Sequence, residues 1–323
     1  MPVWLIVILS ILGGLIVLLF LILLGLYLFT FYSPKKGQSD HYNLNSPIYR
    51  GMEEQVKPLI DNIVTIPYED AYIISFDKLK LHARIYLKPD SKKVAVLCHG
   101  YRGTPYRDFS GGAVEVLKLG YNVVLIDERA HGPSKGHSIT FGIRETRDAI
   151  DWVRYARNRF GEDIDLALIG ISMGGAVVLM AADKVGKAKI IADCPFTSPR
   201  IILQQTVKAM GLPVPIFYPL LNLSSIIFSH TNLNKLSAYD SIKNTDSKIL
   251  IIHGGSDAVV PNWISNDLYQ EYPDKIQYEL FEGANHGMSY LVDKPRYQTL
   301  IKEFLKWKAA LIVLLFINSY ESY

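Results

Sequence analysis

The stretch Leu168-Ile169-Gly170-Ile171-Ser172-Met173-Gly174-Gly175-Ala176 ends an apolar run with a serine between two glycines. Its pattern predicts a buried strand over 165–169 and a helix over 173–185. A serine on a sharp turn between the two would sit in strained backbone, so the residues two positions away must be small. Gly-x-Ser-x-Gly alone also fits a plain loop, but the flanking strand and helix favour Ser172 as an exposed nucleophile.

Short apolar runs alternate with longer amphipathic ones from residue 71 onward. An antiparallel pair is expected first, at 72–76 and 79–87. The strands expected after it are 93–98, 122–127, 166–169, 190–193, 249–253 and 277–281, and the expected helices are 112–119, 142–159, 173–185, 262–272 and 295–308. This alternation predicts an α/β fold with a mostly parallel sheet and helices on both faces. Ligands in such folds bind beyond the carboxyl ends of the strands.

Residues 197–239 interrupt the alternation, because they contain no clear strand, several prolines and apolar helical pieces such as 216–227. An insertion between two sheet strands is predicted to form a helical cap over the pocket, at about 197–240. The alternative is that these pieces only thicken the fold.

A serine nucleophile needs a base to accept its proton and donors to hold the developing negative charge. The loop Gly283-Ala-Asn-His286-Gly287 follows the last strand, which makes His286 the candidate general base. Asp257 follows the preceding strand in a turn that ends at Pro261, and is the candidate carboxylate that orients His286. The order Ser, Asp, His is that of the α/β-hydrolase arrangement.

The oxyanion hole is expected from two backbone N–H groups, those of Met173 and Tyr101. Tyr101 lies in a loop whose glycines, Gly100 and Gly103, allow it to fold back toward the serine. Because the donors are main-chain groups, a change of the Tyr101 side chain should alter substrate fit more than oxyanion binding.

Other polar residues at strand ends have structural alternatives. Asp127 and Asp193 also follow strands and are rivals of Asp257 for the acid. His99 and His253 are expected to be buried, hydrogen-bonded supports, and His131 to brace a loop. Neither a His-x-x-His pair nor clustered carboxylates occur at metal-ligand spacing, so no metal and no cofactor is predicted.

The N-terminal segment 3–32 contains no charged residue and is predicted to be a transmembrane anchor. A cleaved signal peptide is the alternative, but it would have a basic start, a shorter apolar stretch and a small-residue cleavage site. Lys35 and Lys36 follow the helix and favour a cytoplasmic position for the large domain. The sequence is expected to divide into four parts. They are an anchor (1–33), a linker (34–65) with a short helix near 53–64, a hydrolase-like domain (66–308) and an apolar tail (309–323).

Composition limits the remaining possibilities. The 323 residues are 49% hydrophobic, which is enough for a sizeable core. The net charge of +3 and the absence of a basic block argue against a nucleic-acid partner. Cys98 and Cys194 occupy apolar strand ends and are expected to be buried thiols instead of a disulfide.

Several motifs together resemble the α/β-hydrolase superfamily, over about residues 70 to 308. They occur in the family's order and are Cys98-His99-Gly100-Tyr101-Arg102-Gly103, Asp127-Glu-Arg-Ala-His131-Gly132-Pro-Ser134-Lys-Gly136, Gly170-Ile-Ser172-Met-Gly174-Gly175, His253-Gly-Gly-Ser-Asp257-Ala-Val-Val-Pro261 and Gly283-Ala-Asn-His286-Gly287. The similarity is to the lipase, esterase and serine-aminopeptidase-like branch, which includes membrane-anchored bacterial members. Ala130 stands where many relatives have glycine, and residues 309–317 are more apolar than expected after a last surface helix.

The expected activity is hydrolysis of carboxylic esters of acyl or lipid-like substrates through an acyl-enzyme intermediate, at the membrane. The ester preference depends on the apolar cap and the anchor. A serine peptidase or a thioesterase is the close alternative, although residues 197–239 contain no acidic cluster for a charged peptide terminus. A catalytically inactive, membrane-tethered binding protein is the alternative from another class.

Overall fold

The computed structural model describes residues 1–34, 41, 42, 44 and 47–306. Lys35, Lys36 and the apolar segment 309–317 lie outside these described residues. The predictions of sidedness and of a membrane-contacting tail therefore stay predictions.

An eight-stranded sheet forms the centre of the structure, in the order β1-β2-β4-β3-β5-β6-β7-β8. The strand bounds are β1 Glu69–Ile74, β2 Lys80–Tyr86, β3 Lys93–Cys98, β4 Asn122–Asp127, β5 Asp165–Ile171, β6 Lys189–Asp193, β7 Lys248–Gly254 and β8 Ile276–Phe281. β2 is antiparallel to both β1 and β4, and the remaining neighbours are parallel. The predicted α/β class and the predicted antiparallel entry pair are confirmed.

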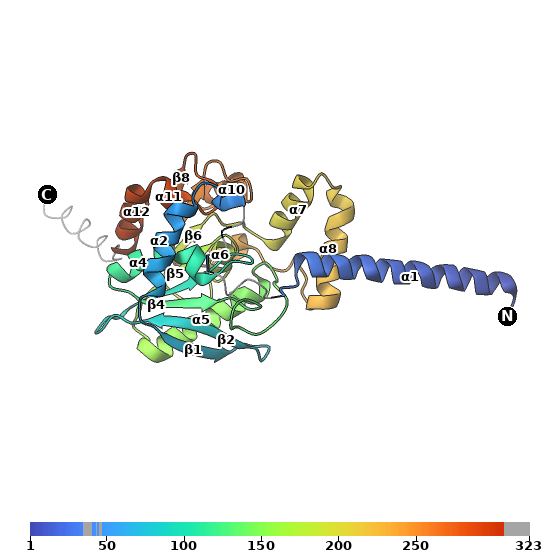
Figure 1. The fold of residues 1–323 in the computed structure, drawn as a ribbon, viewed down its shortest axis with the longest axis horizontal. Helices are drawn as coiled ribbons and strands as arrows, with labels where there is room; N and C mark the ends of the chain where they lie inside the picture. The colour runs from blue at the N-terminus through green and yellow to red at the C-terminus, as the bar shows by residue number, and fades with distance from the viewer. Residues whose placement is uncertain (35–40, 43, 45–46, 307–323) are drawn as a thin grey trace, which may run out of the picture.

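Helices cover both faces of this sheet (Figure 1). Their bounds are α1 Val3–Thr30, α2 Glu53–Val64, α3 Pro105–Phe109, α4 Gly112–Lys118, α5 Ile143–Phe160, α6 Met173–Met180, α7 Pro199–Ala209, α8 Val214–Ser229, α9 Ala238–Lys243, α10 Trp263–Glu271, α11 Ser289–Val292 and α12 Lys294–Lys306, with a short 3₁₀ helix η1 at Pro47–Tyr49. The helix expected over 173–185 ends at Met180 and continues as a turn.

Alternate residues of β3 show why the central strands are apolar throughout. Val94, Val96 and Cys98 are buried in the cluster on one face, which also contains residues of α5 and α6. Ala95 and Leu97 are buried in the cluster on the opposite face, with residues of α4 and α12. A parallel sheet that is covered on both faces needs apolar side chains at every position.

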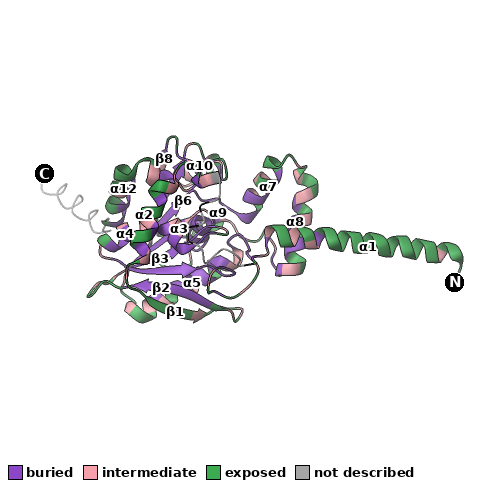
Figure 2. Ribbon diagram, viewed as in Figure 1, coloured by how far each residue is buried: buried purple, intermediate pink, exposed green. Residues whose placement is uncertain are grey.

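The C-terminal end of α1 is part of the folded domain. Phe31 has no exposed surface, and its ring lies 5.9 Å from that of Phe141. The N–H of Ile139 donates to the carbonyl of Phe31 at 2.8 Å, and the Tyr27 hydroxyl lies 2.7 Å from the hydroxyl oxygen of Ser138. By contrast, the N-terminal turns of α1, up to Ile22, extend away from the domain and are almost entirely exposed (Figure 2).

The insertion between β6 and β7 forms helices α7, α8 and α9, and α8 packs against α1. The Ser224 hydroxyl donates to the carbonyl of Leu23 at 2.8 Å. The ring of Phe228 lies 5.2 Å from that of Tyr27 and 5.7 Å from that of Phe20. The cap and the N-terminal helix therefore touch each other as well as the domain.

Helix α2, expected within a linker, packs onto the domain. Its buried residues Val56 and Ile60 form a small cluster with Tyr49 and Met288. Helix α2, which precedes the sheet in the sequence, is thus part of the packed domain.

Replacement of Phe31 by alanine is expected to lower the free energy of unfolding by about 3–5 kcal/mol, because it leaves a cavity in a well-packed core. Thermal unfolding of the full chain in a mild detergent would measure it. Phe29→Ala is the matched control, since Phe29 is 66% exposed, and should change the stability by less than about 1 kcal/mol. An equal effect of both variants would show that the end of α1 is not docked as described.

Candidate active site

The turn at Ser172 is held by close backbone approaches. Ser172 has φ 55° and ψ −114°, a conformation that L-residues rarely adopt. A Cβ on Gly170 would lie 2.1 Å from the carbonyl oxygen of Gly174, and one on Gly174 would lie 1.9 Å from that of Cys98. Only glycine fits at these two positions, and the strained turn between them presents the Ser172 hydroxyl at the carboxyl end of β5.

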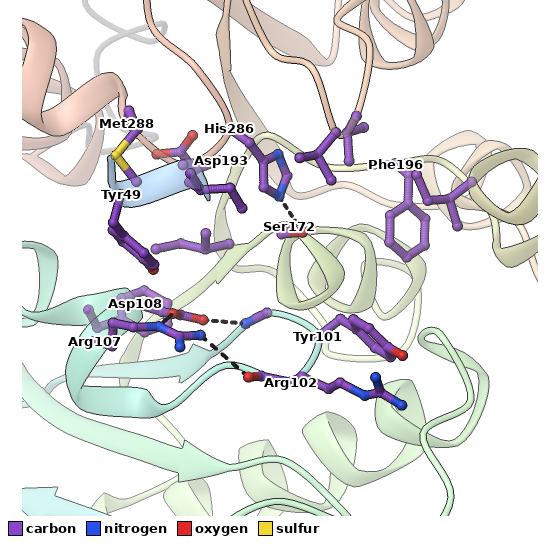
Figure 3. Close-up of a pocket in the computed structure, with 18 of the residues that line it drawn as sticks. Tyr49, Tyr101, Arg102, Arg107, Asp108, Ser172, Asp193, Phe196, His286 and Met288 are labelled. Carbon is purple, nitrogen blue, oxygen red and sulfur yellow. Dashed lines mark hydrogen bonds and ion pairs between the residues drawn. The ribbon is translucent and has the colours of Figure 1, made fainter. Parts of the chain in front are cut away.

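Loops from three strand ends bring Ser172, His286 and Asp257 together. Nε2 of His286 lies 2.8 Å from the hydroxyl oxygen of Ser172, and Nδ1 lies 2.7 Å from a carboxylate oxygen of Asp257. Figure 3 shows His286 directed at Ser172 across the floor of a cavity. This arrangement can pass the serine proton to the imidazole while the carboxylate fixes the ring.

Asp257 is buried and ionised. Burial would raise the pKa of its carboxyl, but hydrogen bonds from His253 and His286 outweigh burial and hold the pKa well below its usual range. The N–H groups of Val259 and Val260 also donate to this carboxylate, at 2.9 Å and 2.8 Å. Asp257 is thus a fixed negative charge beside His286.

The two rival acids have other partners. Asp127 accepts from Arg84 at 2.8 Å and lies 2.6 Å from Nδ1 of His82. Asp193 accepts from the Tyr297 hydroxyl at 3.0 Å, and burial raises the pKa of its carboxyl to about 6. Only Asp257, of these three carboxylates, is hydrogen-bonded to His286.

The predicted oxyanion donors flank the serine. Met173 begins α6, where the first N–H groups of a helix have no partner within the helix. The loop with Tyr101 passes beside Ser172, since a Cβ on Gly100 would lie 3.4 Å from that of Ser172. The N–H of Gly100 donates to the Asp108 carboxylate at 2.9 Å, which holds the loop in place.

Three further histidines support the loops around the serine. His99 accepts from the N–H of Glu128 at 3.0 Å, and His131 accepts from the N–H of Arg102 at 3.0 Å. His253 lies 2.6 Å from the hydroxyl oxygen of Ser265. All are buried, as predicted for structural histidines.

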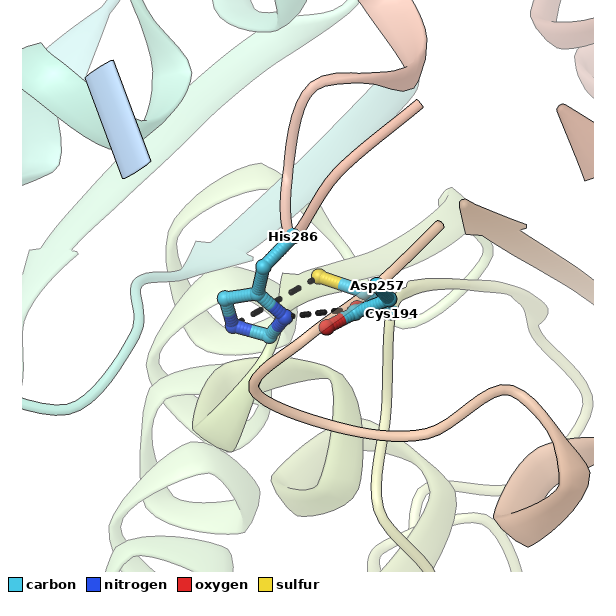
Figure 4. Close-up of side chains that lie close together, drawn as sticks. All are labelled: Cys194, Asp257 and His286. Carbon is cyan, nitrogen blue, oxygen red and sulfur yellow. Dashed lines mark hydrogen bonds and ion pairs between the residues drawn. The ribbon is translucent and has the colours of Figure 1, made fainter. Parts of the chain in front are cut away.

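Cys194 lies beside the imidazole, which its strand-end position in the sequence did not indicate. Its sulfur is 3.9 Å from Nε2 of His286, and Figure 4 shows it with Asp257 around the ring. Both cysteines are buried and free, as predicted.

Cys194, Asp257 and His286 could approach one metal ion. However, the ring nitrogens of His286 already face Asp257 and Ser172, and burial raises the pKa of the Cys194 thiol. The geometry therefore fits proton transfer better than metal binding.

A cavity of 660 Å³ lies above Ser172 and His286. Its lining is mostly apolar and comes from the cap, from η1 and α2, from the segment around α3, and from the end of α1. The cap contributes Ile202, Leu203, Val207, Phe217 and Leu221. The contributions of α1 and α2 could not be read from the sequence, because they arise from long-range packing.

Comparisons with known proteins support this fold. A family model described as serine aminopeptidase, S33, matches residues 89–241, which include Ser172 but not Asp257 or His286. The Pyrococcus furiosus esterase Pf2001 superposes with a TM-score of 0.61 over 76% of this chain and 92% of that one, at 23% identity. The chain therefore has the α/β-hydrolase fold.

Similar proteins are also found among curated sequences. The uncharacterized Bacillus subtilis protein YqkD is 26% identical over 220 residues, which cover 67% of this chain and 72% of that protein. A thiohydrolase, aneE, of Aspergillus aculeatus is 30% identical over 133 residues, which cover 40% of this chain and 42% of that protein.

Replacement of Asp193 by asparagine is expected to stabilise the protein at neutral pH. Folding raises the pKa of the Asp193 carboxyl from about 4 in the unfolded chain to about 6. The folded protein therefore loses stability as the pH rises through this range, because the buried carboxyl becomes charged. Asparagine stays neutral and still accepts from Tyr297, so its advantage should grow to about 3 kcal/mol above pH 6 and vanish near pH 4. Melting temperatures of both proteins at pH 4.5 and pH 8 would measure this. An advantage independent of pH would contradict it.

Proposed function

We propose that this protein is an α/β-hydrolase that cleaves carboxylic esters of acyl chains through a covalent acyl-enzyme. The observation that carries the proposal is the hydrogen-bonded series from Ser172 to His286 to Asp257 at the floor of an apolar cavity. In this proposal Ser172 is the nucleophile, His286 the general base and Asp257 the carboxylate that orients it.

The reaction would run in two halves. The hydroxyl oxygen of Ser172 attacks the ester carbonyl while Nε2 of His286 accepts its proton, and the N–H groups of Tyr101 and Met173 stabilise the oxyanion. Asp257 stabilises the imidazolium, which then protonates the departing alkoxide. Water, deprotonated by His286, then attacks the acyl-serine, and His286 returns the proton to the Ser172 oxygen as the acid is released.

The apolar lining favours an acyl chain over a peptide. A peptidase that recognises a charged terminus would need an opposite charge in the cap, and residues 197–239 contain no Asp or Glu. An acyl thioester is the second candidate, because the aligned Aspergillus aculeatus protein is named a thiohydrolase. The same serine and cavity would serve either substrate.

We also propose that α1 anchors the enzyme in a membrane. Its 28 residues carry no charge and have a mean hydropathy of 3.3 over the best window. A signal peptide would be removed, but removal after Thr30 would detach a segment whose carbonyls accept from the Tyr101 hydroxyl at 2.8 Å and the Arg102 guanidinium at 2.8 Å. Lys35 and Lys36 would place the domain on the cytoplasmic side.

Replacement of Ser172 by alanine is expected to abolish labelling by a fluorophosphonate probe and the turnover of p-nitrophenyl esters, because the nucleophile is lost. Ser110→Ala is the matched control, since Ser110 lines the same cavity but bonds the carbonyl of Arg107 at 3.4 Å. Both variants should have the same melting temperature as the parent protein. Persistent labelling of Ser172→Ala would refute the assignment, and a higher kcat/KM on acyl thioesters or aminoacyl anilides than on esters would shift the substrate class.

Alkaline carbonate extraction is expected to leave the full-length chain in the membrane fraction, with its N-terminal segment intact by mass spectrometry. The reason is that α1 spans the bilayer and its end is packed into the domain. As a control, the same chain with Leu12 and Leu15 both changed to Asp should be released, since each charge near the bilayer centre costs about 3 kcal/mol. A mature chain that starts after residue 20 would contradict the anchor.

A further inference from the structure

The end of α1 is also a wall of the cavity that holds Ser172. Leu26, Phe29 and Thr30 line that cavity. Phe29 is 66% exposed, so the cavity reaches the surface at the last turn of α1. Met210, after α7, is another lining residue at this surface and is 56% exposed.

The length of α1 places this opening relative to a bilayer. About 20 residues precede Leu23, where α8 crosses α1, and at about 1.5 Å per residue they span about 30 Å, the thickness of a hydrocarbon core. The whole 28-residue helix spans about 42 Å, close to a bilayer with its headgroups. The cavity wall at Leu26 to Thr30 would therefore lie in the headgroup layer.

Helix α8 carries an apolar surface at the same depth. Its sequence contains no Asp, Glu, Lys or Arg. Ile216, Leu223, Ile226 and Ile227 are each at least 38% exposed, while Phe217 and Leu221 of the same helix line the cavity. A helix with apolar side chains on both its inner and outer faces is suited to lie between a protein pocket and lipid.

The oxyanion loop is tied to this part of α1. The Tyr101 hydroxyl donates to the carbonyl of Thr30 at 2.8 Å, and the Arg102 guanidinium donates to the carbonyls of Phe29 and Tyr32 at 2.8 Å and 3.0 Å. The bonds to Phe29 and Thr30 satisfy carbonyls that the end of a helix leaves without partners. These bonds thus fix the position of the end of α1 relative to the loop that carries the proposed Tyr101 donor.

We propose that the substrate is a lipid ester of the bilayer that enters the cavity at the end of α1, with its acyl chain against Leu26 and Phe29 and beneath α8. This inference rests on the proposed serine hydrolase activity and adds the source of the substrate and the residues that select its chain. It also means that a truncated protein without α1 would lack one wall of its own site.

The test uses the full chain in phosphatidylcholine nanodiscs. Leu26→Trp should fill the part of the cavity next to α1. It should lower kcat/KM for p-nitrophenyl palmitate by about tenfold, while kcat/KM for p-nitrophenyl acetate changes less than about twofold. Leu28→Trp is the matched control on the same helix, since Leu28 is 48% exposed, and should leave both values unchanged. No loss on palmitate, or equal loss on both esters, would overturn the proposal.

A second measurement does not depend on catalysis. Ser172→Ala in nanodiscs that contain a phosphatidylcholine with a terminal acyl diazirine is expected to give cross-links at Leu203 and Val207, cap residues that line the cavity and are 2% and 3% exposed. Cross-links confined to outward residues of α1 such as Leu19 would show that the chain does not enter. Failure of the proposed activity would appear separately, as loss of fluorophosphonate labelling in the parent protein.

Discussion

The approach of Gly174 to the carbonyl of Cys98 is the constraint on which the site depends. A side chain at Gly174 would collide with the backbone at the end of β3, and one at Gly170 would collide with Gly174 itself. The contact brings the start of α6 against the end of β3. It therefore places Ser172 next to the loop that contains Tyr101, and the strain at Ser172 is maintained by the sheet around it.

A second constraint joins the N-terminal helix to the same loop. Hydrogen bonds from Tyr101 and Arg102 end at carbonyls of the last turn of α1. Phe31 then completes the core beside Phe141. The end of the predicted anchor, near residue 33, is therefore packed against the rest of the protein.

The sequence was sufficient to predict the sheet and the positions of Ser172, Asp257 and His286 at one edge, because each follows a parallel strand. It was not sufficient to predict that α1 and α2 line the cavity. Apolar residues such as Leu26 and Val56 fit a membrane span or a linker helix equally well, and only long-range packing decides. The position of Cys194 beside His286 depends likewise on how neighbouring strand ends meet.

Peptide mapping of the fluorophosphonate adduct would decide whether Ser172 is the nucleophile that His286 activates. The full-length protein is labelled, digested and analysed by tandem mass spectrometry. We predict a single adduct on Ser172, and its loss when His286 is changed to alanine because the base is removed. An adduct on another serine, or labelling of Ser172 that persists without His286, would contradict this mechanism.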